Sequence, residues 1–124
     1  LEELFFICAE KGSISLLTNL KLLVKSQNDS YEALRYIKRF VGILSVAVLS
    51  KKDSSSEELT NTHLPKYLFL KKNIFKKIIE NNSSEKVSKI YNLIQRTEII
   101  LRKNPSNYFE VTERFLLNFG KLIS

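Results

Sequence analysis

The chain has 124 residues and is 44% hydrophobic, which is typical of one folded domain and excludes a disordered chain. Its three glycines and two prolines are too few for an all-β domain of this length, which needs more turn residues. The formal net charge is +7, and because no apolar run reaches the roughly 18 residues of a bilayer-spanning helix, we expect no contact with a membrane.

Two short helices are predicted at the start of the chain. Residues 1–11 have one apolar side, which consists of Leu1, Leu4, Phe5 and Cys8. Gly12 can take the left-handed conformation that ends a helix, and Ser13 can cap the next one. That second helix covers about residues 14–26, with an apolar stripe of Leu16, Leu17, Leu20, Leu23 and Val24. The short connection predicts a helical hairpin.

The third predicted helix runs from about Tyr31 to Ser50 and is the most apolar. Residues 27–30 are predicted to form a polar turn, in which Asp29 has capping-box spacing to Glu32. The apolar stripe comprises Leu34, Ile37, Phe40, Val41, Leu44 and Val48. Further apolar residues widen this stripe, so we expect the second half of the helix to be central or covered by a partner. The opposite face carries Arg35, Lys38 and Arg39.

Residues 51–63 are predicted to form an internal loop, because they include three consecutive serines and only one large apolar residue, Leu59. Within this loop, Glu57–Asn61 can alternatively form a turn of helix. We expect His63, the single histidine, at the surface. The apolar segment that follows, Leu64 to Phe69, is either extended or a helix with Pro65 in its first turn.

The segment from Lys66 to Lys77 contains five lysines and no acidic residue. Aromatic residues alternating with basic ones are typical of surfaces that bind single-stranded nucleic acid. At helical spacing, however, Phe69 and Phe75 point away from the lysines, which favours a place in the core. Residues 73–80 are predicted to be helical, with Ile74, Phe75, Ile78 and Ile79 facing one way.

A long amphipathic helix is predicted from Ser84 to Pro105, with Ser83 or Ser84 as its cap. Its apolar face comprises Val87, Ile90, Tyr91, Ile94 and Leu101. Glu98 and Arg102 have the spacing and order of a favourable ion pair, and Pro105 ends the helix. The other segments are expected to pack around this face.

The last helix is predicted over about residues 108–122, with Asn107 and Glu110 at cap-plus-acid spacing. Its expected buried residues are Tyr108, Val111, Phe115, Leu116, Phe119 and Leu122. Gly120 lies near enough to the end to be part of a frayed turn. Together the patterns predict an all-α fold, a compact bundle of about five to six helices in one domain over residues 1–124.

The sequence shows no pattern that indicates catalysis, a cofactor or a metal site. The single cysteine, Cys8, lies among apolar residues and is expected to be a buried thiol. Residues 63–124 carry the whole net charge, with twelve Lys and Arg against five acidic residues. This asymmetry indicates either a solvated lysine-rich surface or a partner that is nucleic acid or an acidic protein. Surplus apolar residues on the third and last helices indicate an oligomer interface or a thick core.

An ordered set of residues resembles the C-terminal domain of the delta subunit of the bacterial DNA polymerase III clamp loader. A proline and a bulky apolar segment lead into a basic stretch, represented by Pro65, Phe69, Lys71, Lys72 and Phe75. A helix then carries an acid and, four residues later, a base, matched by Glu98 and Arg102. A last helix carries an acidic–basic–aliphatic run, matched by Glu113, Arg114, Phe115, Leu116 and Leu117.

Upstream, the third helix matches with Ala33, Leu34, Arg35, Ile37, Arg39 and Leu44. The chain departs from the family where Leu64 replaces a second proline and where the serine-rich loop is longer. The resemblance implies a non-catalytic collar domain that holds delta in a ring with delta-prime and the ATPase subunits. This ring loads the sliding clamp onto primed DNA in the cytoplasmic, nucleoid-associated replisome.

In this family the clamp is contacted by an N-terminal region. Because the sequence contains no Met, we expect it to be a C-terminal fragment that lacks the family's N-terminal AAA+-like domains. The resemblance implies no cofactor and possible proximity to DNA. The competing hypothesis is a basic helical module that binds nucleic acid.

Overall fold

A computed structural model describes residues 3–10 and 13–123, and within these ranges all regular structure is helical. The predicted all-α class is confirmed. The described residues form seven α-helices and two 3₁₀-helices. The α-helices are α1 (Glu3–Glu10), α2 (Ser13–Leu23), α3 (Gln27–Leu49), α4 (Ser56–His63), α5 (Lys72–Asn81), α6 (Ser84–Lys103) and α7 (Tyr108–Ile123). The 3₁₀-helices are η1 (Lys66–Lys71) and η2 (Pro105–Asn107).

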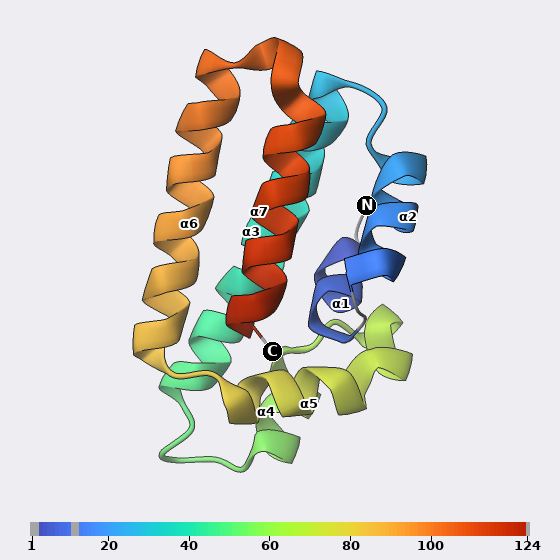
Figure 1. Cartoon of the computed structure of the whole chain (residues 1–124). Helices are drawn as coiled ribbons and strands as arrows, with labels where there is room; N and C mark the ends of the chain where they lie inside the picture. Colours follow the sequence, from blue (N-terminus) through green and yellow to red (C-terminus); the bar gives the residue numbers. More distant parts are fainter. Residues whose placement is uncertain (1–2, 11–12, 124) are drawn as a thin grey trace.

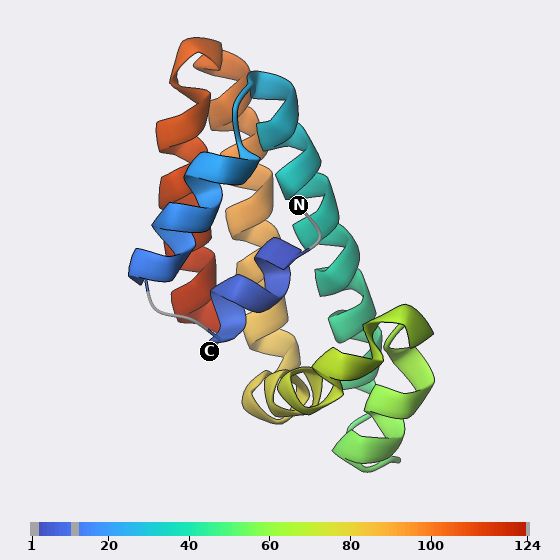
Figure 2. The same ribbon diagram turned by 90° about the vertical axis from the view of Figure 1, so that its right-hand side faces the viewer.

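The three longest helices, α3, α6 and α7, lie side by side and form the body of the bundle (Figure 1). The short helices α1 and α2 pack on the side of α3 and α7 that faces away from α6 (Figure 2). Helices α4 and α5 cross one end of the bundle, and η1 lies beside them. The core therefore lies between α3, α6 and α7, with α1 and α5 closing it.

A cluster of phenylalanines joins α1 to α3 and α7. The ring of Phe5 stacks on Phe40 with a centroid distance of 5.1 Å, and it lies 5.9 Å from Phe119. Phe6, which the predicted apolar face of α1 did not include, is also buried and meets Phe40 edge-on at 5.5 Å. Because α1 buries two neighbouring positions, its packing is broader than one helical stripe. Leu1 and the predicted Gly12 cap lie outside the described residues.

Gly120 lies at the contact between α7 and α1, and the prediction of a frayed end was wrong. A Cβ atom at this position would lie 3.0 Å from the backbone carbonyl oxygen of Cys8. The helix continues beyond Gly120 to Ile123, which is buried. Glycine here allows the backbones of two helices to approach closely.

Helix α3 begins earlier than predicted, because Ser26 rather than Asp29 is its N-cap. The hydroxyl of Ser26 accepts a hydrogen bond from the Asp29 N–H at 3.2 Å. The carboxylate of Asp29 reaches back and accepts from the Lys25 N–H at 3.0 Å. Residues 27–30 are therefore the first turn of α3, and α2 ends at Leu23, three residues before its predicted end.

A small buried polar cluster connects the first turns of α3 and α7. The Thr112 hydroxyl lies 2.8 Å from the Ser30 hydroxyl and 2.7 Å from the Tyr108 carbonyl oxygen. The Tyr108 hydroxyl donates to the Lys25 carbonyl at 3.1 Å. These contacts fix the end of the bundle where the chain enters α3.

The second half of residues 51–63 forms α4, so the alternative of a helical turn over Glu57–Asn61 is confirmed, whereas the prediction of a loop as far as residue 63 was wrong. Ser55 caps this helix by accepting from the Glu58 N–H at 3.2 Å. Leu59 and Thr60 are buried, and the Ser56 hydroxyl donates to the Glu80 carboxylate on α5 at 2.9 Å. A helix with one large apolar residue is stable here because it packs on α3 and α5.

The boundaries of α5 and α6 agree with the sequence prediction within one or two residues. Asn82 separates them, is buried, and donates to the carbonyls of Ile78 at 2.8 Å and Ile123 at 3.0 Å. Ser83 caps α6 through the Lys86 N–H. Before α7, residues 105–107 form η2, which runs directly into the helix, so Asn107 is not the isolated cap that the spacing predicted.

Candidate interaction surfaces

The structure distributes the family-like residues over separate places and does not gather them into one site. Pro65, Phe69, Lys71 and Lys72 lie in and beside η1, while Phe75 lies on α5 and is fully buried. Arg39 is on α3, Glu98 and Arg102 are on α6, and Glu113 and Arg114 are on α7. Two surfaces follow from this distribution, one at η1 and one between α6 and α7.

The first surface, the η1 corner, consists of Lys66, Tyr67, Phe69, Leu70, Lys71 and Lys72. Its apolar side chains are unusually exposed, with fractions of 61% for Tyr67, 62% for Phe69 and 90% for Leu70. The Lys72 ammonium lies over the Phe69 ring, 4.5 Å from its centroid, as a cation–π pair. Large side chains at this exposure contribute little to the core.

The prediction that Phe69 is a core residue was wrong, whereas the same prediction for Phe75 is confirmed. Helix η1 is a 3₁₀-helix with a kink at Leu68, where φ is −101° and ψ is 21°. Leu64 and Phe75 are buried on either side of the kink, and Leu68 packs against the core. Because 3₁₀ turns have three residues instead of 3.6, the α-helical spacing placed Phe69 on the wrong face.

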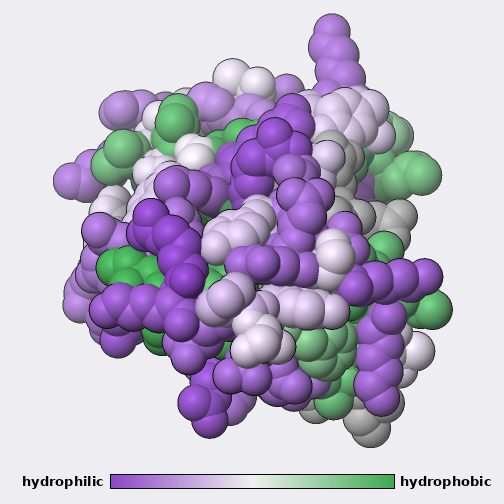
Figure 3. Space-filling view, turned by 90° about the horizontal axis from the view of Figure 1, so that it is seen from above, coloured by the Kyte–Doolittle hydropathy of each residue, from purple (hydrophilic) through white to green (hydrophobic). Residues whose placement is uncertain are grey.

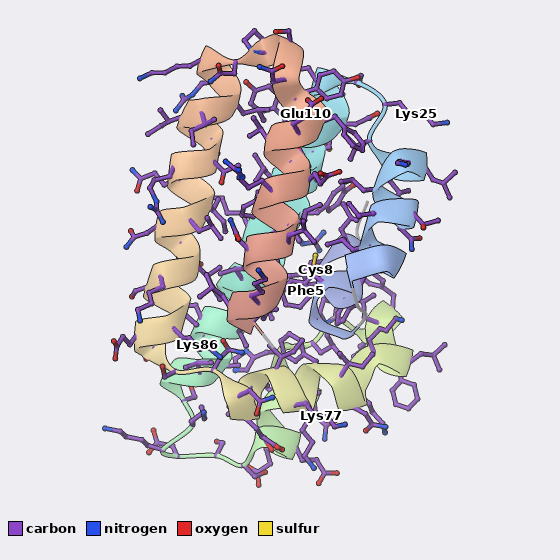
Figure 4. All side chains as sticks on the ribbon, in the orientation of Figure 1. Phe5, Cys8, Lys25, Lys77, Lys86 and Glu110 are labelled. Atoms are coloured by element: carbon purple, nitrogen blue, oxygen red, sulfur yellow. The ribbon has the colours of Figure 1, made fainter. Side chains whose placement is uncertain are left out.

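The lysines around η1 and α5 have no acidic partner among the described residues. Lys66, Lys72 and Lys77 are exposed, and Lys71 and Lys76 are half-buried. Within the described residues, ion pairs form on α3, on α6 and between these two helices. Lys77 lies on α5 at the end of the molecule opposite to Glu110 (Figure 4). These five lysines are therefore not held in ion pairs within the described part of the chain.

The second surface is the α6–α7 groove, an open depression between the two helices. Its apolar lining comprises Leu93, Ile100, Val111, Phe115 and Leu117. Charged side chains of both signs also line it, among them Arg96, Glu110, Glu113 and Arg114. The sequence pattern did not reveal this groove, because its residues lie on the flanks of the two apolar stripes, where helical spacing alone predicts partial burial.

The predicted ion pair between Glu98 and Arg102 was wrong. The Glu98 carboxylate instead lies 3.5 Å from the Lys38 ammonium, so it links α6 to α3. Arg102 is exposed at the end of α6. The pair is largely exposed, so it contributes little to stability.

Surplus apolar surface is present, but its distribution differs from the prediction. On α3, Val46 and Leu49 are exposed at 51% and 69%, as expected. On α6, Ile99 and Ile100 are exposed at 39% and 48%, whereas the apolar residues of α7 are buried or half-buried. The end of the molecule that carries the α6–α7 turn is mostly hydrophilic, with apolar side chains in separate groups (Figure 3).

The single cysteine, Cys8, and the single histidine, His63, lie on different helices, α1 and α4. Cys8 is buried, and this burial raises the pKa of its thiol from 9.0 to about 12. His63 is half-buried in the last turn of α4. In the described ranges, no group of three or more His, Cys, Asp and Glu side chains could hold a metal ion.

None of the described helices is both long and apolar enough to cross a membrane. No family model, characterised protein or solved structure matches this chain.

Proposed function

We propose that this chain is a non-catalytic assembly domain, the collar domain of a DNA polymerase III delta subunit. In this role it holds delta in the clamp-loader ring through helix–helix contacts with delta-prime and the ATPase subunits, within the bacterial replisome. Contact with the sliding clamp belongs to a region outside this sequence. The raised pKa of the buried Cys8 thiol disfavours this residue as a nucleophile, because the thiolate is the nucleophilic form.

The observation that carries the proposal is the α6–α7 groove. Half-buried and exposed apolar residues of α6 and α7 line this groove. Basic and acidic side chains lie beside them in the same lining. Such a groove accepts the apolar face of a partner helix, while the charges set its orientation and register. A mixed-sign lining favours a protein over a polyanion.

The family-like run on α7 supports the same surface. Phe115 and Leu116 are buried in the core, while Glu113, Arg114 and Leu117 line the groove and Phe115 also borders it. These five residues of α7 therefore contribute to two faces of the helix, one in the core and one on the groove. The run that resembles the delta subunit is thus divided between holding the bundle together and shaping the groove.

The test is reconstitution of the chain with delta-prime and the ATPase subunits, followed by size-exclusion chromatography and calorimetry. We expect co-elution, and we expect Ile100→Glu to weaken binding at least about tenfold, because it places a charge in the apolar lining. Leu22→Glu is the matched control, since Leu22 is 66% exposed on α2, on the other side of the bundle. Its affinity should be unchanged.

Absence of a complex with correctly folded wild-type chain would contradict the proposal. Equal losses for Ile100→Glu and Leu22→Glu would show that the groove is not the contact surface. Circular dichroism of both variants confirms that the fold is retained.

A further inference from the structure

The η1 corner exposes two aromatic rings that have no role in the core. Tyr67 and Phe69 project from a 3₁₀-helix whose packing is maintained by other residues, namely Leu64, Leu68 and Phe75. Exposing such rings to water is unfavourable. Their exposure therefore indicates a ligand that covers aromatic faces.

The charge of the same corner restricts what that ligand is. Residues 64–79 contain five lysines and no acidic residue, and these lysines have no ion pair among the described residues. The Lys72 ammonium already lies against the Phe69 ring at 4.5 Å, so positive charge and aromatic surface occupy one place. A ligand with flat rings linked by anionic groups fits both features.

We infer that the η1 corner binds single-stranded nucleic acid. Tyr67 and Phe69 stack on unpaired bases, and Lys66, Lys71 and Lys72 neutralise the adjacent phosphates. Duplex DNA is disfavoured, because its bases are stacked on each other and their faces are not accessible to side chains.

An acidic protein partner fits the corner less well. Protein interfaces are depleted in lysine and enriched in arginine at their centres, whereas all the basic residues of the η1 corner are lysines. A compact ammonium group binds phosphate as a point charge and needs no planar partner. The composition of the corner therefore favours a phosphate backbone over a carboxylate-bearing protein surface.

This inference adds a DNA-contacting surface to the proposed assembly domain and does not depend on it. The two surfaces share no residue, since the groove lies between α6 and α7 and the corner lies on η1 and the start of α5. Each can therefore be removed without altering the other.

The experiment is fluorescence anisotropy of a labelled 20-nucleotide oligo-dT with the whole chain, over a series of salt concentrations. We expect saturable binding whose logarithmic salt slope is about −2, as for three phosphate contacts on a single strand. Tyr67→Ala and Phe69→Ala should each weaken binding at least about fivefold with little change in slope. The triple change of Lys66, Lys71 and Lys72 to Gln should flatten the slope.

The matched control changes three other exposed lysines to Gln, namely Lys21 on α2, Lys25 between α2 and α3, and Lys89 on α6, which removes the same charge elsewhere. Its affinity should stay within about threefold of the wild type. A duplex of the same length should bind more weakly than the single strand.

Three results would overturn the inference: no saturable binding of the oligonucleotide, equal losses for the control and the corner variants, or unchanged affinity after both aromatic substitutions. Loss of clamp-loader subunit binding by the corner variants without oligonucleotide binding would assign the surface to a protein and overturn it as well. If the chain fails to join the clamp-loader ring, the oligonucleotide-binding measurements still test the η1 corner. The assembly proposal and the nucleic-acid proposal can therefore be refuted independently.

Discussion

Two helical glycines, Gly42 and Gly120, differ in how much space surrounds them. At Gly42 in α3, an added Cβ would meet the Tyr91 hydroxyl at 3.7 Å, an ordinary contact, whereas at Gly120 it would lie 3.0 Å from a backbone oxygen of α1. Alanine lowers the entropy of the unfolded chain at both sites. Only at Gly120 must another helix move to accommodate the methyl group.

We therefore expect Gly42→Ala to stabilise the protein by about 0.5–1 kcal/mol and Gly120→Ala to destabilise it by about 1 kcal/mol. Urea unfolding at constant m-value measures both free energies. Equal gains from the two alanines would refute the close approach of α1 and α7.

The buried thiol of Cys8 predicts a specific loss of stability at high pH. Its pKa is raised from 9.0 to about 12 by burial, so its contribution is fully present below pH 9. Between pH 9 and 12 the unfolded chain releases the proton but the folded chain does not, and stability falls as pH rises. Relative to Cys8→Ala, the wild type should lose about 2 kcal/mol more between pH 8 and 10.5.

Urea unfolding of both proteins across this pH range measures the difference, in which the lysines and tyrosines common to both cancel. Parallel pH profiles of the wild type and Cys8→Ala would show that the thiol is accessible to water in the folded state.

At the scale of single elements, the start of α3 depends on one hydroxyl group. Ser26→Ala should destabilise the protein by about 1 kcal/mol, because the Asp29 N–H loses its acceptor. Ser26→Asn, which retains a capping oxygen, should restore most of the loss. Thermal unfolding followed by circular dichroism distinguishes the variants, and an unchanged midpoint for Ser26→Ala would place the start of the helix later in the chain.

The elements that sequence patterns mispredicted are those whose stability comes from neighbours. Helix α4 has one large apolar residue, Leu59, and its place is fixed by packing and by the Ser56–Glu80 hydrogen bond. Helix η1 is too short and too kinked for a period of 3.6 to describe it. By contrast, α5, α6 and α7 are strongly periodic, and their extents agree with prediction.

At the scale of the whole molecule, the excess positive charge of residues 63–124 lies on η1, α5 and α6, whereas the basic and acidic residues of α7 balance. The two candidate surfaces use this charge differently. The α6–α7 groove mixes basic and acidic side chains, whereas the η1 corner has lysines alone. The first arrangement suits a protein helix and the second suits a polyanion.

The sequence by itself determined the all-α class and the inward faces of the long helices, because the positions of Ile90, Ile94 and Leu101 on one face follow from local geometry. Only the tertiary structure decided that Phe69 is exposed, that Glu98 pairs with Lys38, and that Gly120 lies where α7 approaches α1 closely. The reason is physical: these properties depend on contacts between residues that are distant in the chain, which a local repeat does not encode.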